Sequence, residues 1–444
     1  MRGIIIAGAG SGVGKTSIAT GLMSRLSKDN KVQAFKAGPV FIDTMYHRAA
    51  TGRPSRNLDS FMMSDDRICN AVGSASKDAD ICVIEGVRGL YEGFSGDSDV
   101  GSTAYLAKLL GFPVILVMDV RSLTRSAAAI INGFKAFDPQ VNIAGVILNK
   151  TSGDQHRDKL ECAMETYTDV KVVGMIRKDA ENTLEQRYLG LRTLSSFTEK
   201  AITPLETLTE SLDLDVLMDI AEHSEVDLPD SSPYVSRDAD CDVAVPVDDS
   251  FCFYYQDNLD CLNASGMRIK TFSPTNGDTL PDADAYYLGG GYPELYAENL
   301  SQNTDFLQGL KNMSEEGRPV FGECGGLMAM CNGITDSSGK RFPMSGILDA
   351  ESKMTGVRHG PTYVMADATD RNPFFGKGPV IAHEYHYSDV FPEKESVFGY
   401  SVRRGLGISN GMDGLVKGNS MGSYMHQNAL SFDDWAKGFA DNVG

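Results

Sequence analysis

The sequence predicts two α/β domains joined by a short acidic linker. From residue 1 to about 220, short apolar runs rich in β-branched residues alternate with longer segments of helical periodicity. This alternation is typical of a parallel sheet with helices on both faces. Residues 222–240 are rich in proline, serine and acidic residues, as linkers are, and a new strand–helix pattern begins at residue 242. We therefore expect an N-terminal domain over residues 1–225, a linker over 226–241 and a C-terminal domain over 242–444.

The individual elements are expected from apolar runs of strand length and from helical spacing of apolar residues. In the N-terminal domain the expected strands are Ile4–Ala7, Ile81–Ile84, Val114–Asp119, Ala144–Leu148 and Val170–Met175, and the expected helices are Ser17–Leu26, Ser102–Leu110 and Ser126–Phe137. In the C-terminal domain we expect strands at Asp242–Val247, Ala285–Leu288, Pro319–Phe321 and Val380–Ala382, with a helix near Tyr255–Ser265.

The composition excludes several classes of partner. The 444 residues include 41 Lys and Arg and 60 Asp and Glu, for a formal net charge of −19. A surface of this charge repels nucleic-acid phosphates and anionic lipid, so we expect neither as a partner. The N-terminus lacks the apolar core of a signal peptide, and no run of about 18 apolar residues indicates a membrane helix. Eight cysteines without a Cys-x-x-Cys pair are typical of reduced thiols, and we expect a cytoplasmic protein.

The glycine-rich segment after the first expected strand has the composition of a phosphate-binding loop. In such a loop, backbone N–H groups surround phosphate oxygens, the lysine reaches the terminal phosphates, and the next hydroxyl ligates Mg²⁺. Ala9 stands where the strict pattern G-x-x-x-x-G-K-[ST] has glycine, with Gly8 one residue earlier. The alternative is a glycine-rich turn with an incidental lysine. The residues expected to bind ATP here are Gly10, Ser11, Gly12, Val13, Gly14, Lys15 and Thr16.

Three further residues are expected beside this loop because they end strands, and α/β sheets bind ligands at the carboxyl ends of their strands. Glu85 is predicted to hold Mg²⁺ with Thr16, although an acidic residue can also simply end a strand. Lys36 is expected to cover a phosphate, and Asn149 to hydrogen-bond the purine. The loop, the Lys-x-Gly-Pro at 36–39 and the Glu-Gly at 85–86 resemble the dethiobiotin-synthetase-like branch of P-loop ATPases. That resemblance implies activation of a carboxylate as an acyl phosphate.

A second site is predicted around Cys324, which lies between an apolar strand and a helical segment and is flanked by glycines. This pattern is typical of a nucleophile elbow, where a helix N-terminus favours the thiolate. The alternative is a small, buried apolar side chain. His426 is the candidate base, and the glycine turn at 289–291 is suited to oxyanion binding. The expected oxyanion residues are Gly290, Gly291 and Gly325.

These segments resemble a class I glutamine amidotransferase domain of flavodoxin-like fold. The resemblance implies that glutamine is hydrolysed through a thioester on Cys324 and releases ammonia. Many such domains carry an acid two residues after the histidine, where this chain has Asn428, so the third member of the site is unassigned. His383 and His386 form a His-x-x-His pair without a visible third ligand, which disfavours zinc. The histidines expected in loops or on exposed faces are His47, His156, His223 and His359.

The segments Lys36–Ser60 and Glu85–Gly93 closely resemble the cobyrinate a,c-diamide synthase family, and within it the methanogen group. The resemblance extends over both domains. It implies amidation of the a and c carboxylates of cobyrinate or of Ni-sirohydrochlorin, with ATP and L-glutamine as co-substrates and Mg²⁺ as cofactor. The chain departs from the family's usual Asp at Val40 and from its usual Pro at Thr44. Asp43 remains as a further candidate ligand for Mg²⁺.

The polycarboxylate substrate is expected to bind to residues 43–59, because arginine suits bidentate recognition of carboxylates. The alternative is a solvated basic loop. The candidate substrate residues are Asp43, Tyr46, His47, Arg53, Arg56 and Asp59.

Three other functions are alternatives at this point. The first is amidation of other corrin carboxylates, as by cobyric acid synthase, and the second is amidation of a nucleotide. The third is a partitioning-type P-loop ATPase with an inactive amidotransferase domain, against which the presence of both Cys324 and His426 argues. The sequence leaves the oligomeric state open, with a homodimer as one candidate.

Overall fold

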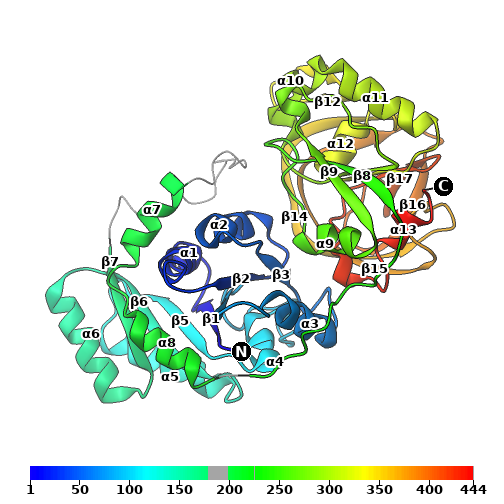
Figure 1. Ribbon diagram of the computed structural model, residues 1–444. Coiled ribbons are helices and arrows are strands. Elements are labelled where there is room, and N and C mark those ends of the chain that lie inside the picture. The colour runs from blue at the N-terminus through cyan, green and yellow to red at the C-terminus, as the bar shows by residue number, and fades with distance from the viewer. Residues whose placement is uncertain (179–198, 225, 444) are drawn as a thin grey trace. The chain divides into compact units, whose positions relative to one another are not determined.

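The computed structural model describes residues 1–178, 199–224 and 226–443. Contacts divide this part of the chain into two compact units, of which the first ends at Pro233 and the second begins at Tyr234. Each unit has its own sheet and its own core (Figure 1). Within the described residues, no helix is both long and apolar enough to cross a membrane.

The first unit is built on seven parallel strands, which confirms the expected parallel sheet. From one edge to the other, the strands are β3 (Arg56–Leu58), β2 (Val32–Ala37), β4 (Ile81–Glu85), β1 (Gly3–Gly8), β5 (Val114–Asp119), β6 (Ile143–Thr151) and β7 (Lys171–Arg177). Since all of them run in the same direction, the segments that follow β1, β2 and β4 meet at one edge of the sheet.

Helices flank both faces of this sheet (Figure 1). They are α1 (Lys15–Leu26), α2 (Phe41–Thr51), α3 (Asp65–Ala75), α4 (Thr103–Leu110), α5 (Arg125–Phe137), α6 (Asp154–Tyr167), α7 (Glu199–Leu208) and α8 (Leu214–Glu222). Ile4 and Val83 join one core cluster with residues of α1, α2, α7 and α8. Their neighbours Ile5 and Cys82 are equally buried, so the opposite face is covered as well. Strands buried on both faces are nearly continuous apolar runs, which is why the sequence revealed them.

The second unit contains a parallel sheet of flavodoxin-like order, which confirms the expected fold of this domain. Across this part of the sheet the strands are β9 (Met267–Phe272), β8 (Cys241–Pro246), β10 (Ala285–Leu288), β11 (Val320–Glu323) and β18 (Ser420–Ser423). Numbered along the chain, they have the order 2-1-3-4-5 of flavodoxin-like sheets. The accompanying helices are α9 (Gln256–Ala264), α10 (Ala297–Gln302), α11 (Thr304–Glu315), α12 (Gly325–Met330) and α13 (Lys437–Ala440).

An antiparallel extension of this sheet was mostly not predicted from the sequence. Its strands are β17 (Met412–Lys417), β16 (Val397–Arg404), β14 (Ala350–Ala368) and β15 (Gly378–Pro392), followed on the far side of β14 by β12 (Gly333–Thr335) and β13 (Arg341–Pro343). The predicted strand Val380–Ala382 is only a short part of β15, which pairs with β14 in a long hairpin. These strands carry many polar residues and alternate in burial, so they lack an apolar run. The other expected elements are present, with ends shifted by at most three residues.

Candidate active sites

The phosphate loop lies between β1 and α1, at the carboxyl edge of the first sheet. Gly12 and Gly14 have φ values of 78° and 93°, in the left-handed region that favours glycine. No side chain caps the first turn of α1, so its N–H groups are available to an anion. Lys15 donates to the carbonyl of Arg88 at 3.3 Å, and a Cβ added at Gly10 or Gly12 would meet nothing within 4 Å. The loop therefore has the open space that phosphates require.

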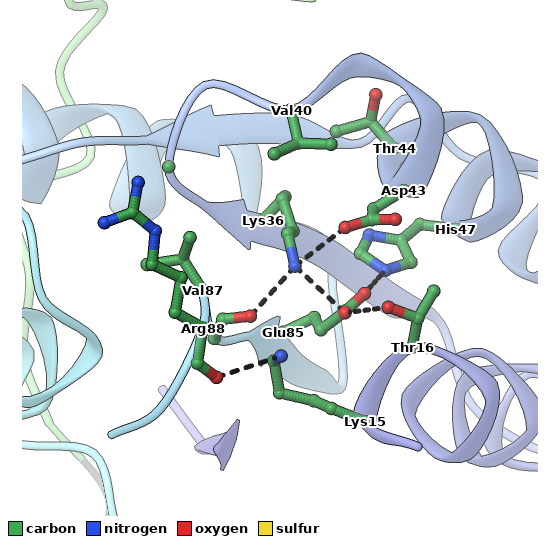
Figure 2. Close-up of polar contacts among 12 residues, drawn as sticks. Lys15, Thr16, Lys36, Val40, Asp43, Thr44, His47, Glu85, Val87 and Arg88 are labelled. Atoms are coloured by element: carbon green, nitrogen blue, oxygen red, sulfur yellow. Dashed lines mark hydrogen bonds and ion pairs between the residues drawn. The ribbon is translucent and has the colours of Figure 1, made fainter. Parts of the chain in front are cut away.

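Lys36, near the end of β2, is the centre of a buried polar cluster beside this loop (Figure 2). Its ammonium lies 2.9 Å from Asp43 Oδ2, 2.9 Å from Glu85 Oε1 and 2.8 Å from the carbonyl oxygen of Gly86. Thr16 donates to the same oxygen of Glu85 at 2.6 Å. The charged side chains of this cluster are at most 3% exposed. The structure thus brings together four residues that the sequence predicted for this site, Lys36, Thr16, Glu85 and Asp43.

His47 on α2 contacts the other oxygen of Glu85. Its Nε2 lies 2.7 Å from Glu85 Oε2, and its Nδ1 lies 3.2 Å from the hydroxyl of Ser55. Burial lowers the pKa of His47, although Glu85 favours the protonated form. Burial alone would raise the pKa of Glu85, but the charge of Lys36 and the hydrogen bond from His47 outweigh it and hold the pKa below its usual value. We therefore assign a neutral His47 that donates to an ionised Glu85.

Val40 and Thr44, where the chain departs from the Asp and Pro usual in the family, lie at the start of α2, next to Asp43 (Figure 2). Val40 is the N-cap residue and offers the helix no side-chain acceptor. Thr44 donates its hydroxyl to the carbonyl of Phe41 at 2.6 Å. Neither Val40 nor Thr44 has a carboxylate. In this turn it is Asp43 that pairs with Lys36.

Three of the predicted substrate residues have side chains that are engaged within the protein rather than open to a substrate. Tyr46 is 3% exposed and belongs to the hydrophobic core between α2 and the sheet. His47 was expected in a loop or on an exposed face, yet it is fully buried on Glu85. Arg53 pairs with Asp78 at 2.6 Å and donates to Gln33 at 3.2 Å, near the amino end of β2. The phosphate loop lies at the opposite, carboxyl edge of the sheet, so Arg53 is not placed to bind a substrate there.

The other predicted residues of this domain have varied positions. Asp59 follows β3 at the carboxyl edge and accepts from the N–H of Phe61 at 2.8 Å. Arg56 begins β3 and is partly exposed. The side-chain amide of Asn149 donates to the carbonyl of Val13 at 2.8 Å, so that it braces the phosphate loop from β6. Its contact with a purine stays a prediction.

Cys324 lies in a sharp turn between β11 and α12, with φ of 50° and ψ of −96°. Such a backbone conformation at a residue with a side chain is typical of a nucleophile elbow. Its N–H donates to the carbonyl of Ser423 at 2.7 Å, which ties the turn to β18. The thiol lies within hydrogen-bonding reach of His426. The structure therefore brings the predicted nucleophile and base together.

His426 is 2% exposed and lies among ionisable side chains. Its Nδ1 is 3.7 Å from Glu323 Oε2, and its ring stacks on that of His383 with 5.0 Å between centroids. Burial would lower the pKa of His426, but Cys324 and Glu323 outweigh it and raise the pKa to about 9. A protonated imidazole beside the thiol favours the thiolate–imidazolium pair that cysteine nucleophiles use.

The glycine turn that precedes Pro293 lies against His426 and against Gly325, the residue after Cys324. A Cβ at Gly290 would be 2.5 Å from Cε1 of His426, and one at Gly325 would be 3.0 Å from the nitrogen of Gly291. For Gly290 the predicted role as an oxyanion donor is wrong, because its N–H donates to the carbonyl of Phe253 at 3.2 Å. Within the part of the chain that the structure describes, the N–H groups of Gly291 and Gly325 have no backbone or side-chain acceptor. They are therefore the remaining candidates for the oxyanion site.

The other histidines of the second unit have structural contacts. His383 Nδ1 lies 2.9 Å from the hydroxyl of Tyr255. His386 donates from Nδ1 to the carbonyl of Ser388 at 2.7 Å, and burial lowers its pKa to about 4. His359 was expected in a loop or on an exposed face, but it lies in β14 and pairs with an aspartate at 3.1 Å. Among the described residues, no three His, Cys, Asp or Glu side chains are grouped to hold a metal ion.

Neither Glu323 nor Arg88 was given an individual role from the sequence. Glu323 ends β11 and faces His426, as described above. Arg88 has φ of 47°, and its exposed guanidinium points away from the buried cluster (Figure 2). A signal for Glu323 did exist, because an acidic residue that ends an otherwise apolar, fully buried strand is rarely incidental.

Comparisons with known proteins match both halves of the chain. Residues 4–189 match the family model described as the CobQ/CobB/MinD/ParA nucleotide binding domain, and residues 242–433 match the CobB/CobQ-like glutamine amidotransferase domain. Among solved structures, a glutamine amidotransferase from Thermotoga maritima is 14% identical, covers 46% of this chain and 84% of its own, and has a TM-score of 0.31. MinD with Mg-ADP from Pyrococcus horikoshii is 17% identical, covers 50% of this chain and 95% of its own, and has a TM-score of 0.30.

Curated proteins called cobyrinate a,c-diamide synthase are similar along the whole chain. The one from Methanosphaera stadtmanae is 42% identical, with 100% of this chain and 99% of the relative covered. The one from Methanococcus maripaludis is 43% identical, and that from Methanocaldococcus jannaschii is 41% identical, each with 97% of both chains covered.

The fold and the two sites define a class, the glutamine-dependent amidating ligases, in which a nucleotide-binding P-loop domain is joined to a glutamine amidotransferase domain. More particularly, the chain belongs to the cobyrinate a,c-diamide synthase family, as its motifs predicted. The similarity over the full chain, together with the assembled Cys324 and His426, argues against a partitioning-type ATPase with an inactive second domain.

Proposed function

We propose that this chain uses ATP and glutamine to convert the a and c side-chain carboxylates of cobyrinate into amides. Membership of the family supports this proposal. The structural observation that carries it is the buried cluster of Lys36, Glu85 and Thr16 beside the phosphate loop. Ni-sirohydrochlorin is the second acceptor that we propose, since the curated relatives named above come from methanogens.

The amidation proceeds in two chemical steps. A carboxylate oxygen of the acceptor attacks the γ-phosphorus of ATP, and ADP leaves, so that an acyl phosphate forms. Ammonia then attacks the acyl carbon, and phosphate leaves as the amide forms. The first step is needed because the oxygen of a free carboxylate is not a leaving group. Lys15 and the N–H groups at the start of α1 hold the phosphates, and Lys36 is our candidate for contact with the transferred group.

The residues beside the loop fit a bound magnesium ion. Glu85 and Asp43 supply two buried carboxylates that already share one cation, the ammonium of Lys36, and Thr16 supplies a hydroxyl. Hard oxygen ligands of this kind suit Mg²⁺, which takes its other ligands from water and phosphate oxygens. When bound, Mg²⁺ neutralises charge on the β- and γ-phosphates during transfer.

Arg88 replaces Arg53 as our candidate for binding acceptor carboxylates. Its guanidinium is exposed and makes no ion pair with the described residues, while its backbone carbonyl accepts from Lys15. An arginine free at this position is suited to bidentate binding of a carboxylate. Asp59 and Arg56 stay as further candidates.

The second domain supplies the ammonia. The thiolate of Cys324 attacks the amide carbon of glutamine, and the N–H groups of Gly291 and Gly325 stabilise the oxyanion. His426 gives its proton to the leaving nitrogen, ammonia departs, and a thioester remains on Cys324. Water then hydrolyses the thioester to glutamate and regenerates the thiol.

Mass spectrometry of the acceptor after turnover tests this proposal. The full chain is incubated with Mg·ATP and glutamine and with either cobyrinate or Ni-sirohydrochlorin. We expect two carboxylates to become carboxamides, with one ADP and one glutamate released for each amide. Unchanged mass of both acceptors contradicts the proposal. Amidation of other corrin carboxylates alone points instead to a cobyric-acid-synthase-like activity.

A further inference from the structure

The position that often holds the acid of such a site does not serve His426 in this chain. Asn428 is two residues beyond the histidine, and its Oδ1 accepts from the N–H of Leu430 at 2.8 Å. Its amide nitrogen lies 3.5 Å from a carboxylate oxygen of Asp257. Both ends of the Asn428 side chain are therefore engaged away from the imidazole.

Glu323 holds a carboxylate next to His426 instead. It is the last residue of β11, it pairs in register with Ser423 of β18, and it is completely buried. Oε1 accepts from the N–H of Gln427 at 3.2 Å, and Oε2 accepts from the hydroxyl of Tyr287 at 3.2 Å. The oxygen of Tyr287 in turn accepts from the amide of Asn258 at 3.0 Å, so the hydroxyl proton points to Glu323. Burial raises the pKa of Glu323, while both of its oxygens accept bonds, as those of an ionised carboxylate do.

We propose that Glu323, the residue immediately before the nucleophile, is a positioning residue that orients and stabilises protonated His426. The inference rests on the proposed glutamine hydrolysis. The distance of 3.7 Å between Oε2 and His426 Nδ1 is that of an ion pair rather than a short hydrogen bond. This ion pair directs Nδ1 of His426 to Glu323, so Nε2 is left to take the proton of the Cys324 thiol. The same proton then passes to the leaving ammonia.

The other groups around His426 do not take this role. His383 and His386 reach it from β15, and burial together with the charge of His426 lowers the pKa of both, so they stay neutral. The buried carboxylate of Asp413 accepts from the hydroxyl of Ser423 at 3.0 Å and from backbone N–H groups. Cys324 is the proton donor. Glu323 is therefore the acid in this environment whose carboxylate pairs with His426.

The test is the hydrolysis of glutamine to glutamate by Glu323→Gln and Glu323→Asp, measured from pH 6 to pH 10 on the full chain. In comparable sites, loss of the orienting acid lowers kcat by up to about 10⁴-fold. Because the pair here is longer, we expect Glu323→Gln to lower kcat about 100-fold with little change in KM. The alkaline limb of its pH profile moves to lower pH, because the neutral amide no longer stabilises the imidazolium. Glu323→Asp keeps the charge and recovers about tenfold.

Glu384→Gln is the matched control. Glu384 is also a fully buried carboxylate of this domain, and it accepts from the N–H groups of Leu406 and Gly407 rather than pairing with His426. We expect its alkaline limb to stay in place. The proposal is overturned if Glu323→Gln keeps its alkaline limb and a kcat within about threefold of the parent. If Glu323→Gln does not fold, the test uses Glu323→Asp. The proposal is then overturned if Glu323→Asp hydrolyses glutamine no faster than the Cys324→Ala chain does. Hydrolysis of glutamine consumes no tetrapyrrole, so failure of this test is distinct from a wrong acceptor.

Discussion

Replacement of Lys36 by methionine removes an ammonium that pairs with two buried carboxylates. Lys36→Met keeps a side chain of similar length in the same apolar surroundings, so the change is mainly one of charge. It leaves Asp43 Oδ2 and Glu85 Oε1 without the cation that lies 2.9 Å from each of them. The carbonyl of Gly86 loses its donor at 2.8 Å. All three acceptors are in a site that is nearly closed to solvent.

The magnitude follows from these contacts. Breaking a buried ion pair by removing one partner costs about 3–5 kcal/mol, because the remaining charge stays uncompensated. Three charged hydrogen bonds of about 1.5 kcal/mol or more each give a similar sum. We therefore expect the free energy of opening of the first unit to fall by about 3–5 kcal/mol, which accelerates amide exchange about 10²- to nearly 10⁴-fold. The double variant Lys36→Met/Asp43→Asn should lose less, since one of the two stranded charges is removed.

Hydrogen exchange followed by mass spectrometry of peptides from β2 and β4 measures this effect. Trp435 is the single tryptophan and is buried in the second unit, so its fluorescence reports that unit as an internal control. Lys77→Met is the matched variant, because Lys77 pairs with Asp230 at the surface, where ion pairs contribute little. Exchange in Lys36→Met within tenfold of that in Lys77→Met refutes the assigned role of Lys36.

Four further predictions follow from the two sites. Cys324→Ala should abolish glutamine-dependent amidation and keep the ammonia-dependent reaction; loss of both activities contradicts a division between two sites. Gly290→Ala places a Cβ 2.5 Å from the imidazole of His426 and should lower glutaminase activity at least about tenfold, whereas Gly376→Ala, with open space around it, should not. Arg88→Ala should raise the KM for the acceptor, and Arg53→Ala should leave it unchanged; the reverse order contradicts our placement of the acceptor. The folded pKa of Glu85 lies below its usual 4.5, so the stability that Glu85 contributes is complete above that pH and lost as the pH falls below it; Glu85→Gln should flatten this acid dependence of amide exchange.

Much of the first domain was predictable because its strands are buried on both faces. Their apolar runs mark the strands, and parallel strands bring the residues that follow them to one edge, which is how Lys36, Thr16 and Glu85 were placed together. Arg53 was misplaced for a reason that lies in the same topology. Helix α2 leads from the carboxyl edge back to the amino edge, so a residue between α2 and β3 lies far from the phosphate loop.

The second site shows a different limit of prediction. Spacing and glycines revealed the elbow at Cys324, since the sharp turn is a local feature. The acidic end of an apolar strand marks Glu323 as unusual, but it does not show which residue Glu323 faces. Its place beside His426 depends on the pairing of β11 with β18, which are about a hundred residues apart in the chain. The N–H of Gly290 is taken by Phe253 from a loop more than thirty residues earlier, which is equally invisible in the sequence.

Transfer of oxygen from the acceptor to phosphate tests the central claim most directly. Cobyrinate labelled with ¹⁸O in its carboxylates is incubated with the full chain, Mg·ATP and glutamine, and the inorganic phosphate is analysed by mass spectrometry. An acyl phosphate leaves one carboxylate oxygen on the phosphate that departs, so we expect one ¹⁸O in the phosphate for each amide formed. Amide formation with phosphate free of ¹⁸O would contradict activation of the carboxylate by ATP at the Lys36 and Glu85 site.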